Sequence, residues 1–438
     1  MEPAEGLDPA IRRVQQADRL RELVDRLLES GTVQGERLRA AGVADGRDVG
    51  LADLPRLPLI EKRDLWDHYP FGLRVADAAD IVCVHGSSGT GGRPTLIPYT
   101  AGDIDVWSQV MARALAGAGA TRQSTVHCAY GYGLFTGGLG VHHGGLRLGA
   151  TVVPASSGMT ERQVRLILDL RPDILCCTPS YAITLAEALR GRPTSLRAGL
   201  FGAEPWTDEL RAQIEAGLGI RALDIYGLSE IIGPGVAAES LDSGGMLNVA
   251  EDHFFPEVIG RDGLPVADGT AGELVFTTLT KTGMPLLRYR TGDIARLAGP
   301  VDGSARTVRR MSKLLGRRDD MLVVRGVNVF PTEIESVLLA DARLSPYYLI
   351  VEDRRDPARA ELRVYCESGQ DLSAEIAGRL RERLGIGCRV IVLPPGSVPR
   401  SETGKAKRLA RWADESDIAK TGLPAVPGHG TAGSELPN

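Results

Sequence analysis

Short apolar runs alternate with segments of helical periodicity through much of the chain, and this alternation restricts the fold more than any other feature of the sequence. The apolar runs lie at residues 81–84, 125–129, 150–153, 174–177, 199–201 and 222–225. The helix-like segments that separate them lie around residues 101–118, 160–170, 181–190 and 207–216. Strands that alternate with helices are typical of α/β layering around a parallel sheet. We therefore predict an α/β fold.

The two ends of the chain show other patterns. Residues 9–45 have apolar positions at helical spacing, which predicts one or two helices. After Gly272 several β-rich segments follow one another, and a new unit begins near residue 319. That unit contains predicted helices over 332–339 and 372–384 between predicted strands, an order that is typical of a small α+β domain.

These patterns predict two domains and a tail. The larger domain covers residues 1–318 and contains several subdomains, and the smaller α+β domain covers residues 319–415. Residues 416–438 are rich in Gly, Pro, Ser and Thr, a composition that predicts disorder.

Composition excludes several classes of function. The net charge is −5 and the isoelectric point about 5.9, so the broadly basic surface of a nucleic-acid-binding protein is absent. Every apolar stretch is shorter than the roughly 18 residues that a membrane-spanning helix needs. The charged N-terminus has no apolar signal core, which predicts a cytoplasmic protein. The six cysteines form no C-x-x-C pair and are predicted to be reduced thiols.

A segment rich in glycine and hydroxyl side chains follows the first apolar run, and it reads H-G-S-S-G-T-G-G-R-P-T over residues 85–95. Its glycines allow main-chain amides to face an anion, its hydroxyls add donors, and Arg93 adds a positive charge. These features favour a polyphosphate-binding loop over a plain surface turn. A Walker A loop is excluded because Gly92 stands where a lysine is required, and the G-x-S-x-G pattern of a nucleophile elbow is broken.

This segment resembles the phosphate loop of the adenylate-forming superfamily, which typically reads S-S-G-T-T-G-K-P-T. Here Gly91 replaces the second threonine and Arg93 replaces the lysine. Four more segments resemble superfamily motifs and follow in the same order. They are D-I-Y-G-L-S-E at 224–230, R-Y-R-T-G-D at 288–293, G-R-R-D-D at 316–320 and S-E-T-G-K at 401–405.

A closer resemblance is to the phenylacetate–CoA ligases, and it extends from about residue 10 to residue 412. The segments that carry it are 57–62, 130–138, 201–206, 251–254 and 325–331. The resemblance implies a large N-terminal adenylation domain with a small mobile C-terminal domain. It also implies ATP, Mg²⁺ and coenzyme A as cofactors. The implied reaction converts an aryl or arylacetic acid to an acyl-adenylate and then to a thioester of coenzyme A.

The resemblance also implies roles for individual residues. Thr90, Arg93, Lys405 and Glu230 would be catalytic, with Glu230 as the Mg²⁺ ligand. Asp319 would be the hinge between the domains, and Gly326 would lie beside the pantetheine arm of coenzyme A. The residues implied to bind ATP are Ser87, Ser88, Gly89, Thr90, Gly91, Lys62, Ala203, Glu204, Pro205, Asp224, Tyr226, Gly227, Asp293 and Arg317.

For the acyl group we expect Tyr132, Phe135, Gly202 and Ala203, because two aromatic side chains can flank an aromatic ring and small residues leave room for it. His253 lies in a matching segment and is a weaker candidate. His142 and His143 are expected to be structural or surface residues, because the sequence offers no third ligand at metal-binding spacing.

Two other functions are compatible with parts of this pattern. The acceptor could be the phosphopantetheine of a carrier protein, or an amine, because coenzyme A and a carrier protein present the same arm. A non-catalytic nucleotide-binding protein is disfavoured, because Lys405, Asp293 and Glu230 are all present. A homodimer is compatible with the resemblance.

Overall fold

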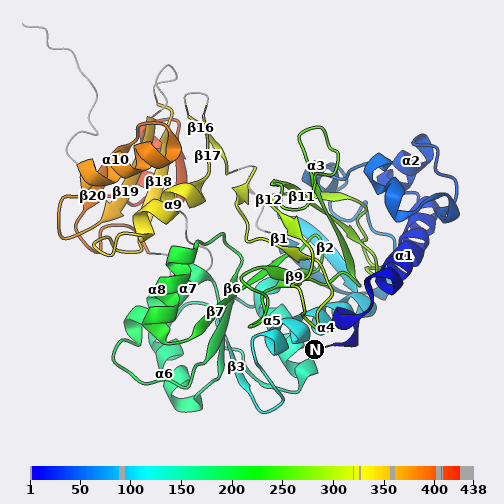
Figure 1. The fold of residues 1–438 in the computed structure, drawn as a ribbon, viewed down its shortest axis with the longest axis horizontal. Coiled ribbons are helices and arrows are strands. Elements are labelled where there is room, and N and C mark those ends of the chain that lie inside the picture. The colour runs from blue at the N-terminus through cyan, green and yellow to red at the C-terminus, as the bar shows by residue number, and fades with distance from the viewer. Residues whose placement is uncertain are drawn as a thin grey trace, which may run out of the picture. The chain divides into compact units, whose positions relative to one another are not determined.

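The computed structural model describes residues 2–87, 94–318, 320–324, 327–355, 361–400, 406 and 408–424 (Figure 1). The chain forms two compact units. The N-terminal unit contains the described residues up to Arg318, and the C-terminal unit contains the described residues from Asp320 onward.

A nine-stranded sheet is the centre of the N-terminal unit, with the strand order β13-β14-β9-β8-β7-β6-β5-β3-β4. Five neighbouring strands are parallel and consist mainly of the predicted apolar runs, so the prediction of an α/β fold is confirmed. They are β3 (Thr125–Cys128), β4 (Thr151–Val153), β5 (Ile174–Cys177), β6 (Ala198–Gly202) and β7 (Arg221–Leu228). The antiparallel strands are β8 (Gly233–Ala238), β9 (Leu247–Val249), β13 (Leu297–Ala298) and β14 (Arg310–Met311).

Helices cover both faces of this sheet. In Figure 1 one group of helices lies on one side of β3, β6 and β7, and another group lies on the other side. The first group is α6 (Thr160–Leu170), α7 (Pro179–Ala188) and α8 (Asp208–Leu218), and the second is α4 (Ala101–Gly117) and α5 (Thr136–Leu148). The second pair packs closely because α5 contains several glycines where it meets α4.

The first apolar run does not join the parallel sheet. It forms β1 (Ile81–Ser87), which pairs with β2 (Thr95–Thr100) in a separate antiparallel sheet. Two parallel strands need a crossover connection of about a dozen residues or more. The connection between β1 and β2 covers only residues 88–94, which permits a hairpin and excludes a parallel crossover. The prediction of parallel strands is therefore wrong for this run.

A four-stranded antiparallel sheet, β10-β11-β12-β15, adjoins the N-terminal segments of the chain. Its strands are β10 (Phe254–Ile259), β11 (Gly272–Thr278), β12 (Tyr289–Ala295) and β15 (Gly316–Arg317). The N-terminal segments contain α1 (Pro9–Glu29), α2 (Val33–Ala40) and α3 (Lys62–Asp67), with short 3₁₀ helices at Pro3–Gly6, Gly46–Asp48, Leu51–Arg56 and Ala78–Asp80. Leucine and valine side chains of α1 pack with Leu279 and Leu287 in one apolar cluster.

The buried Arg288 joins these parts. Its guanidinium donates two hydrogen bonds of 3.0 Å to the carboxylate of Glu257, and it also donates to the main-chain oxygens of Pro55 and Leu57. The main chain of Arg288 has a φ of +48°, which is uncommon for a residue with a side chain. The ion pair therefore fixes an unusual backbone position at the start of β12.

The C-terminal unit is a four-stranded mixed sheet, β20-β19-β18-β21, with two helices and a hairpin. Its strands are β18 (Tyr348–Asp353), β19 (Glu361–Glu367), β20 (Arg389–Leu393) and β21 (Leu409–Trp412). The helices are α9 (Pro331–Leu339) and α10 (Ser373–Leu384), and the hairpin consists of β16 (Leu322–Val324) and β17 (Val327–Val329).

The segment predicted to be disordered begins instead with a short helix, α11 (Glu415–Lys420). The Asp414 side chain accepts a hydrogen bond from the Ser416 amide at the start of this helix, and Ile418 packs against the cluster that contains Trp412. A helix cap and one apolar contact thus order these residues. Residues 425–438 lie outside the described part of the chain.

Within the described residues, no helix combines the length and the apolar character needed to cross a membrane. All six cysteines are free thiols, and four of them are buried.

Glycine 144 tests the packing of α4 against α5. A Cβ at this position would lie 2.8 Å from the carbonyl carbon of Met111 and 2.9 Å from the amide nitrogen of Ala112. We expect Gly144→Ala to lower the free energy of unfolding by about 1–3 kcal/mol, because the helices must move apart. Gly378→Ala on α10 is the control, since no atom lies within 4 Å of its Cβ position and alanine is the better helix former. Urea unfolding measures both, and equal stabilities would contradict the packing argument.

Candidate active site

Several of the predicted site residues lie on neighbouring elements of the N-terminal unit. Ser87 ends β1, Tyr226 and Gly227 lie near the end of β7, and Asp293 and Arg317 lie on the paired strands β12 and β15. The predicted residues Ser88, Gly89, Thr90, Gly91, Arg93, Asp319, Gly326 and Lys405 lie outside the described residues.

Tyr226, Asp293 and Arg317 form one hydrogen-bonded group. The Tyr226 hydroxyl donates to Asp293 Oδ2 at 2.7 Å, and Arg317 Nη1 donates to Asp293 Oδ1 at 2.8 Å. Burial, followed by the charge of Asp293, raises the pKa of Tyr226 well above its usual value, so the phenol remains a donor. The Tyr226 ring stacks on Phe276, with centroids 6.1 Å apart. The structure thus presents an aromatic ring, a carboxylate and a guanidinium together.

The side chain of Glu230 contacts polar groups from two other segments of the chain. Its carboxylate is buried, and its Oε1 accepts a hydrogen bond of 3.0 Å from the Ser87 hydroxyl. Lys62 Nζ lies 3.7 Å from the same oxygen. A buried carboxylate therefore faces a hydroxyl from the end of β1 and an ammonium from the first turn of α3.

Main-chain hydrogen bonds position the segment that precedes Lys62. The Ile60 amide donates to the oxygen of Arg288 at 3.2 Å, and the Arg290 amide donates to the oxygen of Ile60 at 2.8 Å. Asp64 accepts from the Glu61 amide at the start of α3 and pairs with Arg37. The segment before Lys62 therefore runs beside the strand that carries Asp293.

Asp224 lies on β7, the strand at which the parallel part of the sheet ends, and it is next to an ion pair. Its amide donates to Glu239 Oε2 at 2.7 Å, and Arg211 Nη2 donates to Glu239 Oε1 at 2.8 Å. Burial, followed by the charge of Glu239, raises the pKa of the Asp224 carboxyl to about 6.

The segment after β6 contains the remaining residues predicted to bind ATP. Ala203 is exposed and has a φ of +72°, a conformation that residues with a side chain rarely adopt. Glu204 Oε1 accepts a hydrogen bond of 2.6 Å from the Ser180 amide in the first turn of α7, and Pro205 follows. This contact fixes the segment against α7.

The residues predicted to bind the acyl group come from two places. Tyr132 and Phe135 lie on the loop between β3 and α5, and Gly202 and Ala203 lie at the end of β6. Only β5 separates β3 from β6 in the sheet, so the ends of these two strands are about 10 Å apart at a strand spacing of about 4.8 Å. The Tyr132 hydroxyl lies 3.4 Å from His142 Nδ1, and Phe135 is 55% exposed.

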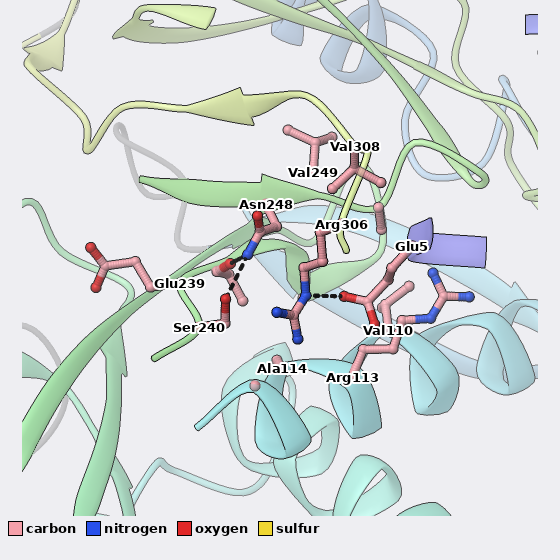
Figure 2. Close-up of a pocket in the computed structure, with 14 residues that line it drawn as sticks. Glu5, Val110, Arg113, Ala114, Glu239, Ser240, Asn248, Val249, Arg306 and Val308 are labelled. Carbon is pink, nitrogen blue, oxygen red and sulfur yellow. Dashed lines mark hydrogen bonds and ion pairs between the residues drawn. The ribbon is translucent and has the colours of Figure 1, made fainter. Parts of the chain in front are cut away.

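Two pockets elsewhere in the N-terminal unit are lined by other residues. The pocket in Figure 2 has a free volume of about 30 Å³, and its lining includes the Arg306–Glu5 ion pair and the Asn248–Ser240 hydrogen bond. That volume suits a buried water rather than a substrate. A second pocket of about 170 Å³ lies between Leu51, Leu54, Phe255 and Val266. None of the predicted site residues lines either pocket.

Sequence reasoning missed two residues that contact the segment carrying Glu230. Lys281 Nζ donates to the main-chain oxygen of Glu230 at 2.9 Å, and Tyr99 donates to the main-chain oxygen of Ser229 at 2.9 Å. Ser229 in turn donates its hydroxyl to the oxygen of Gly86, beside Ser87. The only sequence signal for Lys281 is a charged residue placed three residues after the end of the mainly apolar strand β11.

His253, a weaker candidate, is held by Thr280 at 2.8 Å and Gln109 at 3.2 Å. Burial lowers its pKa to about 4, so it is neutral at physiological pH. These contacts give His253 a clear part in joining α4 to the segment after β11.

In the C-terminal unit, two arginines on either side of residues 401–405 are paired with buried carboxylates. Arg400 donates to both oxygens of Glu367, each at 2.9 Å. Arg408 donates to Glu335 Oε2 at 2.6 Å and to the Tyr348 hydroxyl at 2.7 Å. The chain is therefore fixed before and after this segment.

Comparison with known proteins identifies the family to which this chain is similar. The model of the AMP-binding enzyme family matches residues 13–280, and the model of the AMP-binding enzyme C-terminal domain matches residues 326–411. A phenylacetate–coenzyme A ligase of Thermus thermophilus is 47% identical over 425 residues, covering 91% of this chain and 96% of the relative. A phenylacetate–coenzyme A ligase of Escherichia coli is 44% identical over 411 residues, covering 90% of this chain and 93% of the relative.

Solved structures agree. A 2-hydroxyisobutyryl-CoA ligase in the postadenylation state matches with a TM-score of 0.87 and 26% identity, covering 95% of this chain and 92% of that chain. The same ligase with CoA in the thioesterification state matches with a TM-score of 0.70 and 27% identity, covering 93% and 91%. The chain belongs to the AMP-binding enzyme family and, within it, to the phenylacetate–coenzyme A ligases. Its use of ATP and coenzyme A follows from this membership.

The raised pKa of Asp224 predicts a pH-dependent stability. The carboxyl has a pKa of about 6 in the folded chain and 3.8 as its ordinary value, so the folded state retains the proton more strongly. Stability from this group is complete below pH 4 and is lost as the pH rises through 6. We expect Asp224→Asn, which stays neutral, to gain about 1–3 kcal/mol relative to the wild type between pH 4.5 and pH 7.5, at about 1.4 kcal/mol per pKa unit.

Urea unfolding at both pH values measures this difference. Asp169→Asn, at an exposed position of α6, is the control and should follow the wild type at both. A constant difference between Asp224→Asn and the wild type across this pH range would show that the carboxyl does not titrate there.

Proposed function

We propose that this chain activates an aryl or arylacetic acid with ATP and transfers the acyl group to coenzyme A. The observation that carries the proposal is the gathering of Lys62, Ser87 and Glu230 beside the Tyr226–Asp293–Arg317 group. The identity to phenylacetate–coenzyme A ligases over nine-tenths of the chain supports it.

In the first step a carboxylate oxygen of the acid attacks the α-phosphorus of ATP. A new P–O bond forms, the bond to the β-phosphate oxygen breaks, and pyrophosphate leaves with the electron pair. Negative charge grows on the phosphate oxygens, so positioned donors and cations lower the barrier. We assign this work to Lys62 and Ser87, and to Ser88, Gly89, Thr90, Gly91, Arg93 and Lys405 by their place in the motifs.

We assign Mg²⁺ binding to Glu230. Mg²⁺ prefers carboxylate and other oxygen ligands, and the buried Glu230 carboxylate with the neighbouring Ser87 hydroxyl fits that preference. When bound, the ion would neutralise phosphate charge. Lys62, at 3.7 Å from Glu230, lies where it could contact the same phosphates.

The nucleoside would lie along Tyr226 and Gly227. A Cβ on Gly227 would come within 2.6 Å of Pro234 Cα, so glycine is required where β7 meets β8. We propose that the Tyr226 ring borders the adenine and that Asp293 accepts hydrogen bonds from the ribose hydroxyls. Arg317 would orient the Asp293 carboxylate. The other residues that we assign to this region are Ala203, Glu204, Pro205 and Asp224.

In the second step the thiol sulfur of coenzyme A attacks the acyl carbonyl carbon, and AMP leaves as the C–O bond to phosphate breaks. We propose that residues 1–318 and 319–415 act as two domains that turn about Asp319 between the steps, with Gly326 beside the pantetheine arm. Tyr132 and Phe135 would flank the aryl ring, and Gly202 and Ala203 would leave room for it.

Acid-dependent exchange of pyrophosphate into ATP tests the proposal, with a panel of arylacetic, benzoic and small aliphatic acids. We expect exchange with an aryl or arylacetic acid and, after addition of coenzyme A, the thioester and AMP. Exchange without thioester would move the acceptor to a carrier protein or an amine. No exchange with any acid, from folded protein that binds ATP, would contradict the proposal.

Tyr226→Phe tests the assignment of the ribose site. The variant removes the hydroxyl that donates to Asp293 Oδ2 but retains the ring. We expect the KM for ATP in the exchange assay to rise about five-fold, equivalent to about 1 kcal/mol for one hydrogen bond. The KM for the acid should stay constant.

Tyr181→Phe is the matched control. Tyr181 lies on α7, and its hydroxyl donates to the main-chain oxygen of Gly158 at 3.1 Å. The variant therefore loses the same hydroxyl group at a position without an assigned role. Equal KM values for ATP in the two variants would contradict the assignment of Tyr226 and Asp293.

A further inference from the structure

Lys281 is a buried cation that the mechanism above does not use. Its side chain is 1% exposed, and its ammonium lies 5.0 Å from the centroid of the Tyr99 ring. A buried ammonium costs folding free energy unless charged or polar groups compensate it. Its Nζ donates a hydrogen bond of 2.9 Å to the main-chain oxygen of Glu230.

A second buried residue, Asp103 on α4, holds the turn that carries Lys281. Asp103 Oδ1 accepts from the Thr282 amide at 2.7 Å, and Oδ2 accepts from the Gly283 amide at 2.9 Å and the Thr100 amide at 3.0 Å. The carboxylate thus joins the start of α4 to the two residues after Lys281. Lys281 is therefore fixed at its main chain as well as at its ammonium.

These contacts restrain the segment that carries Glu230. The oxygen of Leu228 accepts from the Ile231 and Ile232 amides, each at 3.1 Å. The oxygen of Ser229 accepts from the Tyr99 hydroxyl, and the oxygen of Glu230 accepts from Lys281. Three consecutive carbonyl groups are thus held, and the last is held by a charged donor, which makes the stronger bond.

We propose that Lys281 is a positioning residue, which fixes the Glu230 main chain so that the Glu230 carboxylate remains directed at Ser87 and Lys62. The proposal rests on the function proposed above, in which Glu230 binds Mg²⁺ beside the ATP phosphates. Lys281 acts only through Glu230. Groups that orient a metal ligand in this way usually change metal affinity when they are removed.

The test uses Lys281→Met, which retains the length and apolar stem of the side chain and removes the donor. Calorimetry measures ATP binding to the full chain with Mg²⁺ and with a chelator. In the wild type Mg²⁺ should tighten ATP binding. In Lys281→Met we expect this gain to fall by about ten-fold, while ATP binding in the chelator is unchanged.

Lys313→Met is the control. Its ammonium lies 4.7 Å from the Trp206 ring and pairs with Asp208 at 2.5 Å, so the same charge and a similar aromatic contact are lost away from Glu230. Mg²⁺ should tighten ATP binding to this variant by the same factor as in the wild type. In pyrophosphate exchange, Lys281→Met should raise the Mg²⁺ concentration for half-maximal rate and leave the KM for the acid unchanged.

Tyr99→Phe provides a second test if Lys281→Met does not fold. It removes only the hydroxyl that holds Ser229 and leaves the ring beside Lys281, so we expect a smaller loss of the same kind. An unchanged Mg²⁺ gain in a folded Lys281→Met, or in Tyr99→Phe when only that variant folds, would overturn the proposal. Wild-type protein that shows no exchange would instead overturn the proposed function and the role of Lys281 with it.

Discussion

The buried ion pair between Arg288 and Glu257 is the contact on which the arrangement of the N-terminal unit depends. The guanidinium of Arg288 also donates to the main-chain oxygens of Pro55 and Leu57, and the main-chain oxygen of Arg288 accepts a hydrogen bond from the Ile60 amide. Lys62 lies two residues beyond Ile60, and Asp293 lies five residues beyond Arg288. One buried side chain thus sets the distance between the two ends of the site. Loss of either partner would leave an unpaired charge in the core, a costly state.

The sequence predicted the layered core well, because the strands β3, β5, β6 and β7 are largely buried, contain mainly apolar residues and alternate with segments of helical periodicity. It did not predict the partner of β1. An apolar run of four residues specifies that a strand is buried, but the length of the next connection decides which strand it pairs with. The helix α11 was missed for a related reason, since its stability comes from Asp414 and from contact with the Trp412 cluster rather than from composition.

The candidate site likewise contains some residues that the sequence predicted and some that it did not. Tyr226, Glu230, Asp293 and Arg317 belong to motifs, and the structure places Tyr226, Asp293 and Arg317 in direct contact. Lys281 and Tyr99 belong to no motif that we identified. Both residues donate to main-chain carbonyl oxygens. Every residue has such an oxygen, so the contact requires no particular side chain that a sequence motif could reveal. Supporting contacts of this kind become visible only when the chain is folded.

The hairpin of β1 and β2 has a consequence for the side chains of residues 88–94, which connect the two strands. Ser87 pairs with Thr95, so the strands on either side of residues 88–94 meet at one fixed point whatever side chains lie between them. Exchanges such as glycine for threonine at 91 or arginine for lysine at 93 then alter the chemistry of the segment without moving its ends. Side-chain chemistry at residues 88–94 can therefore change while the pairing of β1 with β2 is retained.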